Sequence, residues 1–391
     1  MQAIKGLQVF PYDEYMRRLD CVKAKMKAKD VDTLVVFDLS NITYLTGYNA
    51  RSAYVPQALV VKNNEEVPTF MLRPMDAASA LHQTFLPRDK VIGYPESLVG
   101  SEDIDGYDAI IDFILDGRST GENIGLELGD LSSSSERKFH SRLQGINLVD
   151  CTKLVTWVRL IKSDLEVVLH REAAAIVDAA MTRASEVIRP GVREADVMAE
   201  VAATLARGVN GKPSTDLTAM FMCSSPRTGS AHISWSEDVL RAGSQVNLEV
   251  GAVRHAYTSA IMRTFSIGKP SDRLRRVHEA ELEAMHAALE VVKPGNTCSD
   301  VAEAFYQTLG KHGLKKESRC GYPLGINWLE PTASLKVGDM TVLKPNMVFH
   351  LMLGNWIDEE FGYVLSETIR VADGGVEVLT NSVQKIFEID Q

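Results

Sequence analysis

The chain has 391 residues, of which 45% are hydrophobic and 24% are charged, a composition typical of globular proteins rather than of disordered or fibrous ones. Its 52 acidic residues outnumber the 42 basic residues, and the formal net charge is -10. Binding to a nucleic-acid backbone relies on a basic surface, so this charge argues against a nucleic-acid partner. Because single domains usually contain ~100–200 residues, we expect two domains.

The cysteines and the N-terminus bear on the compartment. The five cysteines are odd in number and far apart, and they form no C-x-x-C pair of the kind that serves zinc or redox chemistry. The first 20 residues lack the apolar core of a signal peptide, and no stretch approaches the ~18 apolar residues that cross a bilayer. These features predict a cytoplasmic protein with reduced thiols and no membrane partner.

The first 150 residues alternate helical and strand patterns, which is typical of an α/β arrangement. Residues 12–30 have helical spacing, and residues 33–39 and 57–64 have the composition of buried strands. The intervening segment 41–57 is rich in tyrosine and is predicted to be a loop. Such a loop could carry binding contacts or could simply pack on the surface.

A second pattern begins near residues 150–165. Ser163 and Glu166 have the S-x-x-E spacing of a capping box, which predicts that a long helix starts there. Helical spacing continues over 164–188 and 193–207, on either side of an R-P-G break, and recurs over 271–292 and 298–312, on either side of K-P-G-N. Short strands follow, so this part of the chain is predicted to be α+β.

Residues 246–265 alternate apolar and polar side chains and predict a β-hairpin that lines a cavity, with a glycine-containing turn. A hairpin of this shape could hold a metal ion with two carboxylates. It carries one, Glu249, and Ala260 stands where the second might be expected.

Several ordered motifs resemble the pita-bread fold family (peptidase M24 superfamily) of creatinase, proline-specific aminopeptidases and prolidases. They are RLIKSDLE, the turns IRPGV and VKPGN, MRTFSIGKP, RCGYPLG, LKPNMVFHL and LSETIRVADGGVEVLT. The resemblance implies a creatinase-like N-terminal α/β domain at 1–158 and an α+β pita-bread catalytic domain at 159–391. It also implies a homodimer, in which Arg51 or Tyr54 of the N-terminal loop would reach the neighbouring subunit's pocket.

The resemblance also bears on metal binding. In the metallopeptidases of this family five side chains hold two metal ions, and those positions match Glu249, Ala260, Tyr322, Met352 and Glu367. Neither a methyl group nor a thioether can replace the carboxylates and imidazole that hold such a pair at ~2.0–2.2 Å. We therefore expect a site with no metal ion and no other cofactor.

Two branches of the family lack metal. Creatinase hydrolyses a guanidino C–N bond with a histidine as acid and base, and the segment SPRTGSAHISW (225–235) resembles the one that carries it, which implies this role for His232. The ectoine hydrolases open a cyclic amidine, and segments such as YLTGYNARSAYVPQ and MVFHLMLGNWIDE resemble them more. The loop NWLEPTASL is shorter here than in that branch.

The chemistry of such a converted site follows from its charges. If Glu249 and Glu367 lie together in a dehydrated pocket, their repulsion raises the pKa of one of them unless a cation takes the place of the metals. A planar amidinium or guanidinium can bind a carboxylate through paired N–H donors. His232 could then activate water and protonate the departing nitrogen. Glu249 could orient the cation, act as the base or attack the carbon itself.

Further side chains are candidates for binding a cationic or zwitterionic substrate: Tyr257, Arg263, Tyr322, His350, Trp356, Arg51 and Tyr54. A substrate carboxylate favours an arginine partner, for which Arg263, Arg319 and Arg51 are available. Structural explanations compete with these roles. His232 could be an ordinary loop histidine and His350 a hydrogen-bonded core residue. Arg263 could pair with a neighbouring acid, and the aromatic side chains could simply fill space.

These features predict a metal-independent hydrolase of a non-peptide C–N bond, with ring opening of ectoine to N-acetylated diaminobutyrate as the expected reaction. A creatinase-like hydrolase of another guanidino or amidino compound is the first alternative. The second is a catalytically inactive binding protein of the same fold, which predicts a pocket filled by Tyr322, Met352 and Trp356. A peptidase ranks lower because it would use the missing ligands.

Overall fold

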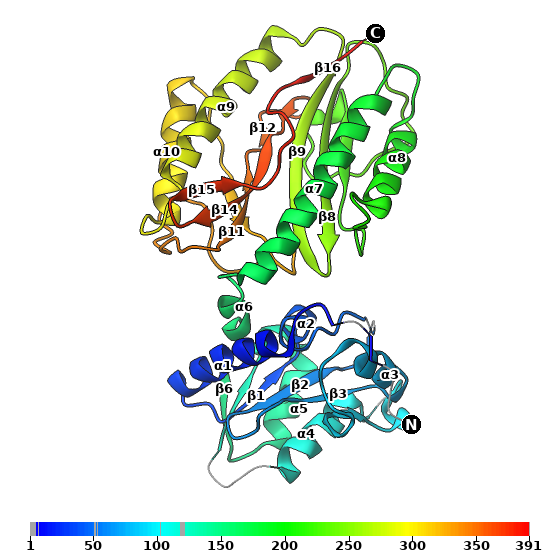
Figure 1. Cartoon of the computed structure of the whole chain (residues 1–391), viewed down its shortest axis with the longest axis vertical. Coiled ribbons are helices and arrows are strands. Elements are labelled where there is room, and N and C mark those ends of the chain that lie inside the picture. The colour runs from blue at the N-terminus through cyan, green and yellow to red at the C-terminus, as the bar shows by residue number, and fades with distance from the viewer. Residues whose placement is uncertain are drawn as a thin grey trace. The chain divides into compact units, whose positions relative to one another are not determined.

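The computed structural model describes residues 5, 6, 8–50, 52, 54–101, 103–117 and 122–390. The chain forms two compact units, Met1–Arg159 and Leu160–Gln391 (Figure 1). The boundary predicted from the sequence, between 158 and 159, lies one residue before this division. Among the described residues, no helix combines the length and the apolar character needed to cross a membrane.

The N-terminal unit is an α/β layer built on a mixed six-stranded sheet with the order β4-β3-β2-β1-β5-β6. Its strands are β1 (Thr33–Val36), β2 (Ala58–Lys62), β3 (Thr69–Leu72), β4 (Val91–Gly93), β5 (Asn123–Leu126) and β6 (Asn147–Asp150). Its helices are α1 (Tyr12–Ala28), α2 (Leu39–Thr46), α3 (Pro74–Gln83), α4 (Gly106–Asp116), α5 (Ser133–Arg142) and α6 (Leu154–Val158). The predicted helix and the two predicted strands are confirmed in position as α1, β1 and β2, but the strand predicted over 33–39 ends at Val36, and Leu39 begins helix α2.

The prediction of a loop over 41–57 is wrong for residues 41–46, which belong to helix α2. The Asp38 side chain caps this helix by accepting the Asn41 N–H at 2.6 Å, and the helix ends at Gly47 with φ 85°. Buried Glu127 also accepts a hydrogen bond from the Asn41 amide at 2.6 Å. Capping and a tertiary contact therefore outweigh a composition typical of loops.

The C-terminal unit places two helix pairs outside two sheets. Its helices are α7 (Asp164–Val187), α8 (Glu194–Arg207), α9 (Asp272–Val291) and α10 (Cys298–Lys311). One sheet contains β7 (Phe221–Ser224), β8 (Gln245–Arg254), β9 (Tyr257–Ile267) and β16 (Phe387–Ile389). The other contains β10 (Gly321–Pro323), β11 (Val348–Met352), β14 (Ser366–Ala372) and β15 (Gly375–Val378). A short hairpin pairs β12 (Asn355–Trp356) with β13 (Gly362–Tyr363).

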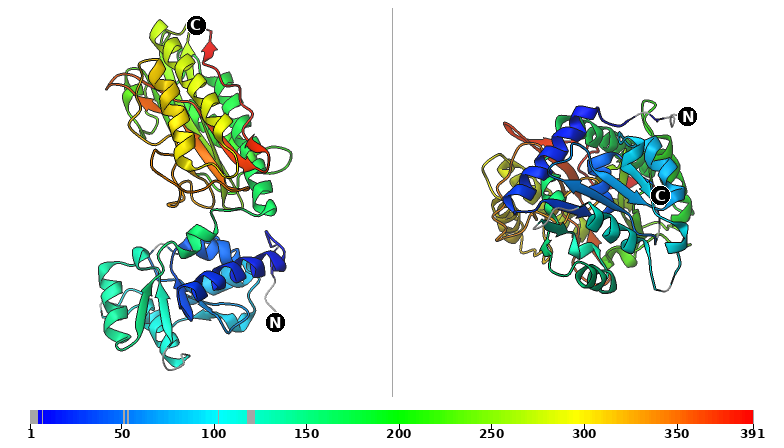
Figure 2. Two further views of the ribbon diagram at one scale, coloured as in Figure 1. Left: turned by 90° about the vertical axis from the view of Figure 1, so that its left-hand side faces the viewer. Right: turned by 90° about the horizontal axis from the view of Figure 1, so that it is seen from below.

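The four helices predicted for this unit form within one residue of the predicted ends. Ser163 and Glu166 make the expected capping box at the start of α7, and Thr297 and Asp300 make a second one at the start of α10. Helices α7 and α8 lie on one side of the strands, and α9 and α10 lie on the other (Figures 1 and 2). This layered α+β architecture is the pita-bread arrangement that the sequence predicts.

Strand alternation gives each sheet two different faces. On the β8–β9 hairpin, Leu248, Val250 and Ile261 pack towards α7 and α8. Glu249 and Met262, which pair across the hairpin, lie on the opposite face. This second face meets an apolar cluster from the other half of the unit, which includes Tyr322, Leu324, Val348, Met352 and Val364. Glu249 and Met262 therefore lie between the two halves.

The predicted hairpin is confirmed, but its turn contains no glycine. His255 and Ala256 connect β8 to β9 with φ values of 48° and 75°, because a two-residue turn between twisted strands needs positive φ at both positions. Gly251 instead lies inside β8, where an added Cβ would come within 2.3 Å of the Trp328 ring. The glycine permits a close aromatic contact rather than a turn.

Candidate active site

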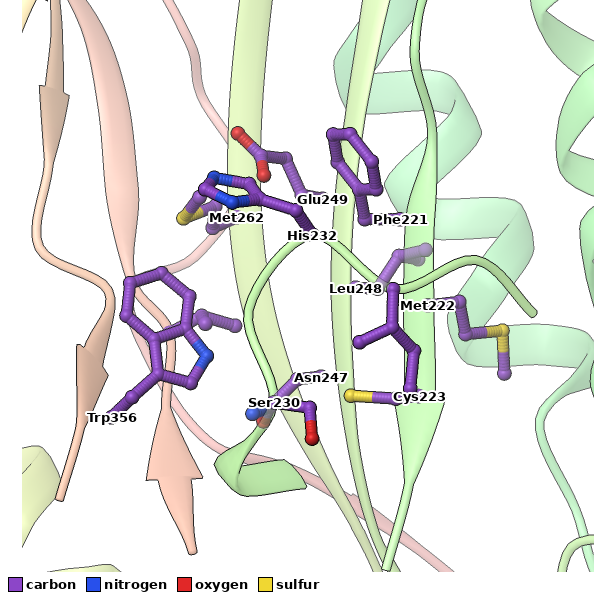
Figure 3. Close-up of a pocket in the computed structure, with 12 residues that line it drawn as sticks. Phe221, Met222, Cys223, Ser230, His232, Asn247, Leu248, Glu249, Met262 and Trp356 are labelled. Atoms are coloured by element: carbon purple, nitrogen blue, oxygen red, sulfur yellow. The ribbon is translucent and has the colours of Figure 1, made fainter. Parts of the chain in front are cut away.

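A small pocket opens beside the β8–β9 hairpin and has a volume of about 30 Å³. Figure 3 shows its lining, which includes Phe221, Ser230, His232, Glu249, Met262 and Trp356. These side chains come from β7, from the segment 225–235, from the hairpin and from β12. The structure thus brings together three of the predicted site residues: His232, Glu249 and Trp356.

Glu249 is the acidic group of this pocket. Its residue is 7% exposed, and its carboxyl group has no hydrogen-bond or ion-pair partner among the described residues. Burial raises the pKa of Glu249 to about 8. The carboxyl group is therefore mainly protonated at neutral pH when the pocket is empty, and a cation bound beside it would favour the charged form.

His232 stands at the exposed side of the pocket. Its backbone is left-handed, with φ 57°, a conformation that histidine adopts more readily than most residues. Its ring centroid lies 5.6 Å from that of Phe221 and 6.2 Å from that of Trp356. In Figure 3 the imidazole lies on the same side of the pocket as the Glu249 carboxyl group. An acid/base group and a buried carboxyl group thus share one small space.

Glu367 is not in this pocket, which corrects the prediction that it shares the site with Glu249. Its side chain is buried and accepts hydrogen bonds from Arg263 Nη2 at 2.6 Å, from Gln384 at 3.0 Å and from the Thr380 hydroxyl. Successive residues of a strand point to opposite faces, and Ser366 is the residue whose hydroxyl turns to β9, where it accepts the Met262 N–H at 2.6 Å. The predicted position is therefore displaced by one residue.

Arg263 cannot bind a substrate carboxylate, contrary to the prediction. All five of its N–H donors are used inside the protein, one of them by Glu367. The other acceptors are the backbone carbonyl groups of Met262, Ser366, Ser382 and Val383. The structure therefore supports the alternative in which Arg263 pairs with an acid.

Tyr257 is also committed elsewhere. Its hydroxyl donates to Glu166 Oε1 at 2.8 Å, and the residue is 2% exposed. This contact joins the start of β9 to the first turn of α7. Tyr257 does not line the pocket, so the structure corrects its predicted role in substrate binding.

His350 and Tyr322 belong to a buried hydrogen-bond chain behind the pocket. Trp328 Nε1 donates to the Tyr322 hydroxyl at 2.9 Å, which lies 3.1 Å from His350 Nδ1, and His350 Nε2 lies 2.7 Å from Ser366 Oγ. Burial lowers the pKa of His350 to about 3, so the ring is neutral and can donate to one neighbour and accept from the other. His350 is therefore a hydrogen-bonded core residue, as the structural alternative predicts, and neither residue is among those that line the pocket. Substrate binding by Tyr322 stays a prediction.

Two of the residues predicted to bind substrate, Arg51 and Tyr54, belong to the N-terminal unit. Tyr54 is 76% exposed there. Arg51 lies outside the described residues, and the predicted action of this loop across a dimer stays a prediction. In the C-terminal unit, Arg319 places its guanidinium over the Tyr322 ring, 4.8 Å from the centroid, and does not line the pocket.

Sequence reasoning missed the two residues that flank Glu249 across the sheet. In the strand register Glu249 pairs with Phe221 of β7 and with Met262 of β9, and both line the pocket. Counting back from the hairpin turn could have found Met262, because residues opposite each other share a face. The position of Phe221 depends on a strand more distant in sequence, and no local pattern predicts it.

The residues present do not fit the pair of metal ions used by the family's peptidases. The corresponding inner face carries Glu249, Ala260, Tyr322, Met352 and Ser366, a set with one carboxylate and no imidazole. Within the described part of the chain, no three His, Cys, Asp or Glu side chains come together as a metal-binding group. Hard divalent cations need several such oxygen or nitrogen donors.

Comparisons with known proteins agree with this fold. Residues 18–161 match the creatinase/prolidase N-terminal domain, and residues 168–373 match metallopeptidase family M24. The chain is 62% identical over 390 residues to the uncharacterized hydrolase/peptidase y4tL of Sinorhizobium fredii, with complete coverage of both chains. It is 32% identical to the ectoine hydrolase of Halomonas elongata, covering 97% of this chain and 98% of that one.

Among solved structures, the dipeptidase PepE of Mycobacterium ulcerans superposes with a TM-score of 0.84 at 23% identity, over 98% of this chain and all of the other. At that identity the likeness concerns the fold alone. The family match spans more than half of the chain, and the fold agrees with it. The chain is therefore a member of metallopeptidase family M24 with a creatinase/prolidase N-terminal domain.

Proposed function

We propose that this protein is a metal-independent hydrolase of a non-peptide C–N bond in a small organic cation, with the cyclic amidine ectoine as the principal candidate substrate. One observation carries the proposal: a buried carboxyl group without a protein partner among the described residues, Glu249, faces a pocket that also holds His232. The 32% identity to a protein named ectoine hydrolase, over nearly the full length of both chains, supports the substrate.

The ionisable groups that line the pocket suit a cation. No lysine or arginine is among the residues that line it in the described part of the chain, and its one acid has no counter-ion there. An amidinium can pair its N–H groups with the Glu249 carboxylate, and the indole of Trp356 offers a face for a planar cation. Binding of the cation would lower the pKa of Glu249 and release its proton.

Hydrolysis then requires one water molecule. The water oxygen bonds to the amidine carbon, the ring C–N bond breaks, and the departing nitrogen takes a proton. In this proposal His232 removes the proton from water and returns one to that nitrogen. Glu249 holds the cation in place, and its two alternative roles, as the base or as the nucleophile, would use the same carboxylate.

A second candidate is a binding protein without catalysis. The pocket is small, with a volume of about 30 Å³, and it is open to solvent on one side. Apolar side chains such as Met262 and Val364 take up much of the surrounding space. A hydrolase would hold its substrate partly in the open mouth of this pocket or widen the pocket, whereas an inactive relative need do neither.

The test is to incubate purified protein, with and without a chelator, with ectoine, hydroxyectoine and creatine, and to follow the gain of one water by mass spectrometry. We expect ectoine to be hydrolysed in both conditions. Turnover of creatine alone supports the creatinase-like alternative, and absence of turnover on the whole panel supports the binding protein. Loss of activity on chelation would overturn metal independence.

Variants test the two assigned residues. Glu249→Gln removes the charge and His232→Asn removes the acid/base group, and each should lower turnover by at least ~100-fold, the usual contribution of such a group. Glu237→Gln, an exposed acid near the end of the His232 segment, is the matched control and should keep normal activity. A near-normal rate in either test variant would remove that residue from the mechanism.

We further propose a cytoplasmic homodimer. Light scattering of the purified chain would measure its mass, for which a monomer has 43.1 kDa. A purely monomeric protein that retains activity would exclude any contribution of Tyr54 across a dimer.

A further inference from the structure

The segment that carries His232 is held at both of its ends by one buried carboxylate. Glu194, the first residue of α8, has no exposed surface. Its Oε1 accepts the Ser224 N–H at 2.8 Å and the Ser224 hydroxyl at 2.7 Å, before the segment begins. Its Oε2 accepts the Ser236 N–H at 2.8 Å and the Ser236 hydroxyl at 2.9 Å, after the segment ends.

Arg227 completes this arrangement from within the segment. Its Nη2 lies 2.8 Å from each oxygen of Glu194 and 3.0 Å from Asp238. Burial alone would raise the pKa of Glu194, but the hydrogen bonds from Ser224, Arg227 and Ser236 outweigh burial and hold this pKa below its ordinary value. Glu194 is therefore ionised at neutral pH and uses both oxygens as acceptors.

The middle of the segment has fewer attachments. Thr228 is fixed by its hydroxyl to the Glu360 carbonyl at 3.0 Å, and its own carbonyl accepts from Asn247 at 3.4 Å. Beyond it, the His232 side chain makes ring contacts with Phe221 and Trp356 and has no hydrogen bond among the described residues. The direction of the imidazole therefore depends on where the two ends of the segment are held.

We propose that Glu194 is a positioning residue for His232: by joining Ser224 to Ser236 it closes the segment 225–235 in the form that presents the imidazole to Glu249. This inference rests on the proposed function for its kinetic consequence. A glutamine at 194 has one acceptor oxygen, and its NH₂ group would face N–H donors from either Ser224 or Ser236. Glu194→Gln must therefore release one end of the segment.

The kinetic test compares Glu194→Gln with Glu200→Gln, a matched change on the same helix at a half-exposed salt bridge with Arg183. We expect Glu194→Gln to lower kcat about 10- to 100-fold, since small displacements of a catalytic group have effects of this size. KM should change less, and Glu200→Gln should leave both constants unchanged. Equal rates in the two variants would overturn the inference.

Two further measurements separate positioning from general damage. In a His232→Asn background, Glu194→Gln should cause no further loss of turnover, because the group that it positions is absent. If Glu194→Gln lowers the rate equally in both backgrounds, its role is structural and the inference fails. Ser236→Ala, which removes one hydroxyl and keeps the N–H donor, serves as a milder variant and should show a smaller loss of the same kind.

A readout without turnover distinguishes this inference from the proposed function. Nuclear magnetic resonance of isotope-labelled histidine, with the His232 signal assigned by its absence in His232→Asn, should show one sharp signal in the wild type. The signal should broaden or split in Glu194→Gln and stay sharp in Glu200→Gln. An unchanged signal contradicts the positioning role whether or not the protein hydrolyses ectoine.

Discussion

Two buried glutamates of the C-terminal unit, Glu249 and Glu367, have opposite surroundings. Glu367 is paired with the equally buried Arg263 and accepts two further hydrogen bonds. Glu249 has no partner among the described residues and faces the pocket. Removing one partner of a buried ion pair destabilises a protein, because the other charge is left buried alone. A buried carboxylate without a partner lowers the stability of the fold and can bind a ligand. The comparison separates an acid held by a buried counter-ion from one that is open to a ligand.

The largest effect on stability should follow from breaking the ion pair between Arg263 and Glu367. Glu367→Ala leaves the guanidinium of Arg263 buried without its counter-ion, and we expect the free energy of unfolding to fall by ~3–5 kcal/mol. Urea denaturation of the variant measures this change. Glu388→Ala, at an exposed glutamate of β16, is the control and should have almost no effect. An unfolding curve for Glu367→Ala that matches the wild type would show that the pair is not structural.

Replacing the unpaired residue, Glu249, should instead raise the stability of the protein. The pKa of Glu249 is about 8 in the folded state against 4.5 for the free group. Between pH 4.5 and 8, therefore, the carboxyl group keeps its proton in the folded protein and loses it in the unfolded chain. The free energy of unfolding of the wild type therefore falls as pH rises from about 4.5 to 8. Glutamine does not ionise, so Glu249→Gln should equal the wild type near the bottom of this window and exceed it by roughly 1–4 kcal/mol at its top.

Denaturation at several pH values checks this sign. The difference between Glu249→Gln and the wild type should grow through the window and level off above it. Glu237→Gln, at an exposed site, should follow the wild-type curve. If Glu249→Gln is less stable than the wild type at the alkaline end, then Glu249 has a counter-ion that favours its charge, and the contrast with Glu367 disappears.

The smallest expected effect concerns metal ions. Because Glu249 is the one carboxylate among the five described inner-face residues named above, added Mn²⁺ or Zn²⁺ should leave Tm unchanged and purified protein should contain no stoichiometric metal. A specific ligand at 100 times its Kd would stabilise the fold by ~2.7 kcal/mol, which thermal unfolding detects easily. Saturable stabilisation by either ion would mean that Glu249 has metal-binding partners that the family positions do not supply.

The sequence predicts the elements of this fold better than the directions of individual side chains. The capping box at Ser163 and the breaks between helix pairs are local signals, and the structure follows them closely. Sequence reasoning missed helix α2 because the helix depends on the cap from Asp38 and on contact with Glu127, which follows strand β5 and is distant in the sequence. The contact with Glu127 cannot be predicted from the local composition of the segment.

The pairing of Arg263 with an acid is one of the alternatives that the sequence leaves open, but the carbonyl groups that surround its guanidinium are not visible there. Four of its acceptors are backbone atoms, which any residue type supplies, so no motif indicates them. The wrong prediction that Glu367 shares the pocket with Glu249 has a different origin. Matching by chemical likeness prefers an acid, while strand geometry assigns faces by position, and a displacement of one residue reverses the face.

The inner face at Ala260, Tyr322, Met352 and Ser366 also bears on evolution. A return to a two-metal site would require acids or a histidine at all four positions, and any one of these changes made alone would bury a polar or charged group without its metal. Such a step costs several kcal/mol out of the ~5–15 kcal/mol that stabilise a typical domain. Each early mutant would therefore lose stability before it gained a cofactor. A chain without ligands at these positions therefore acquires a two-metal site only through less stable intermediates.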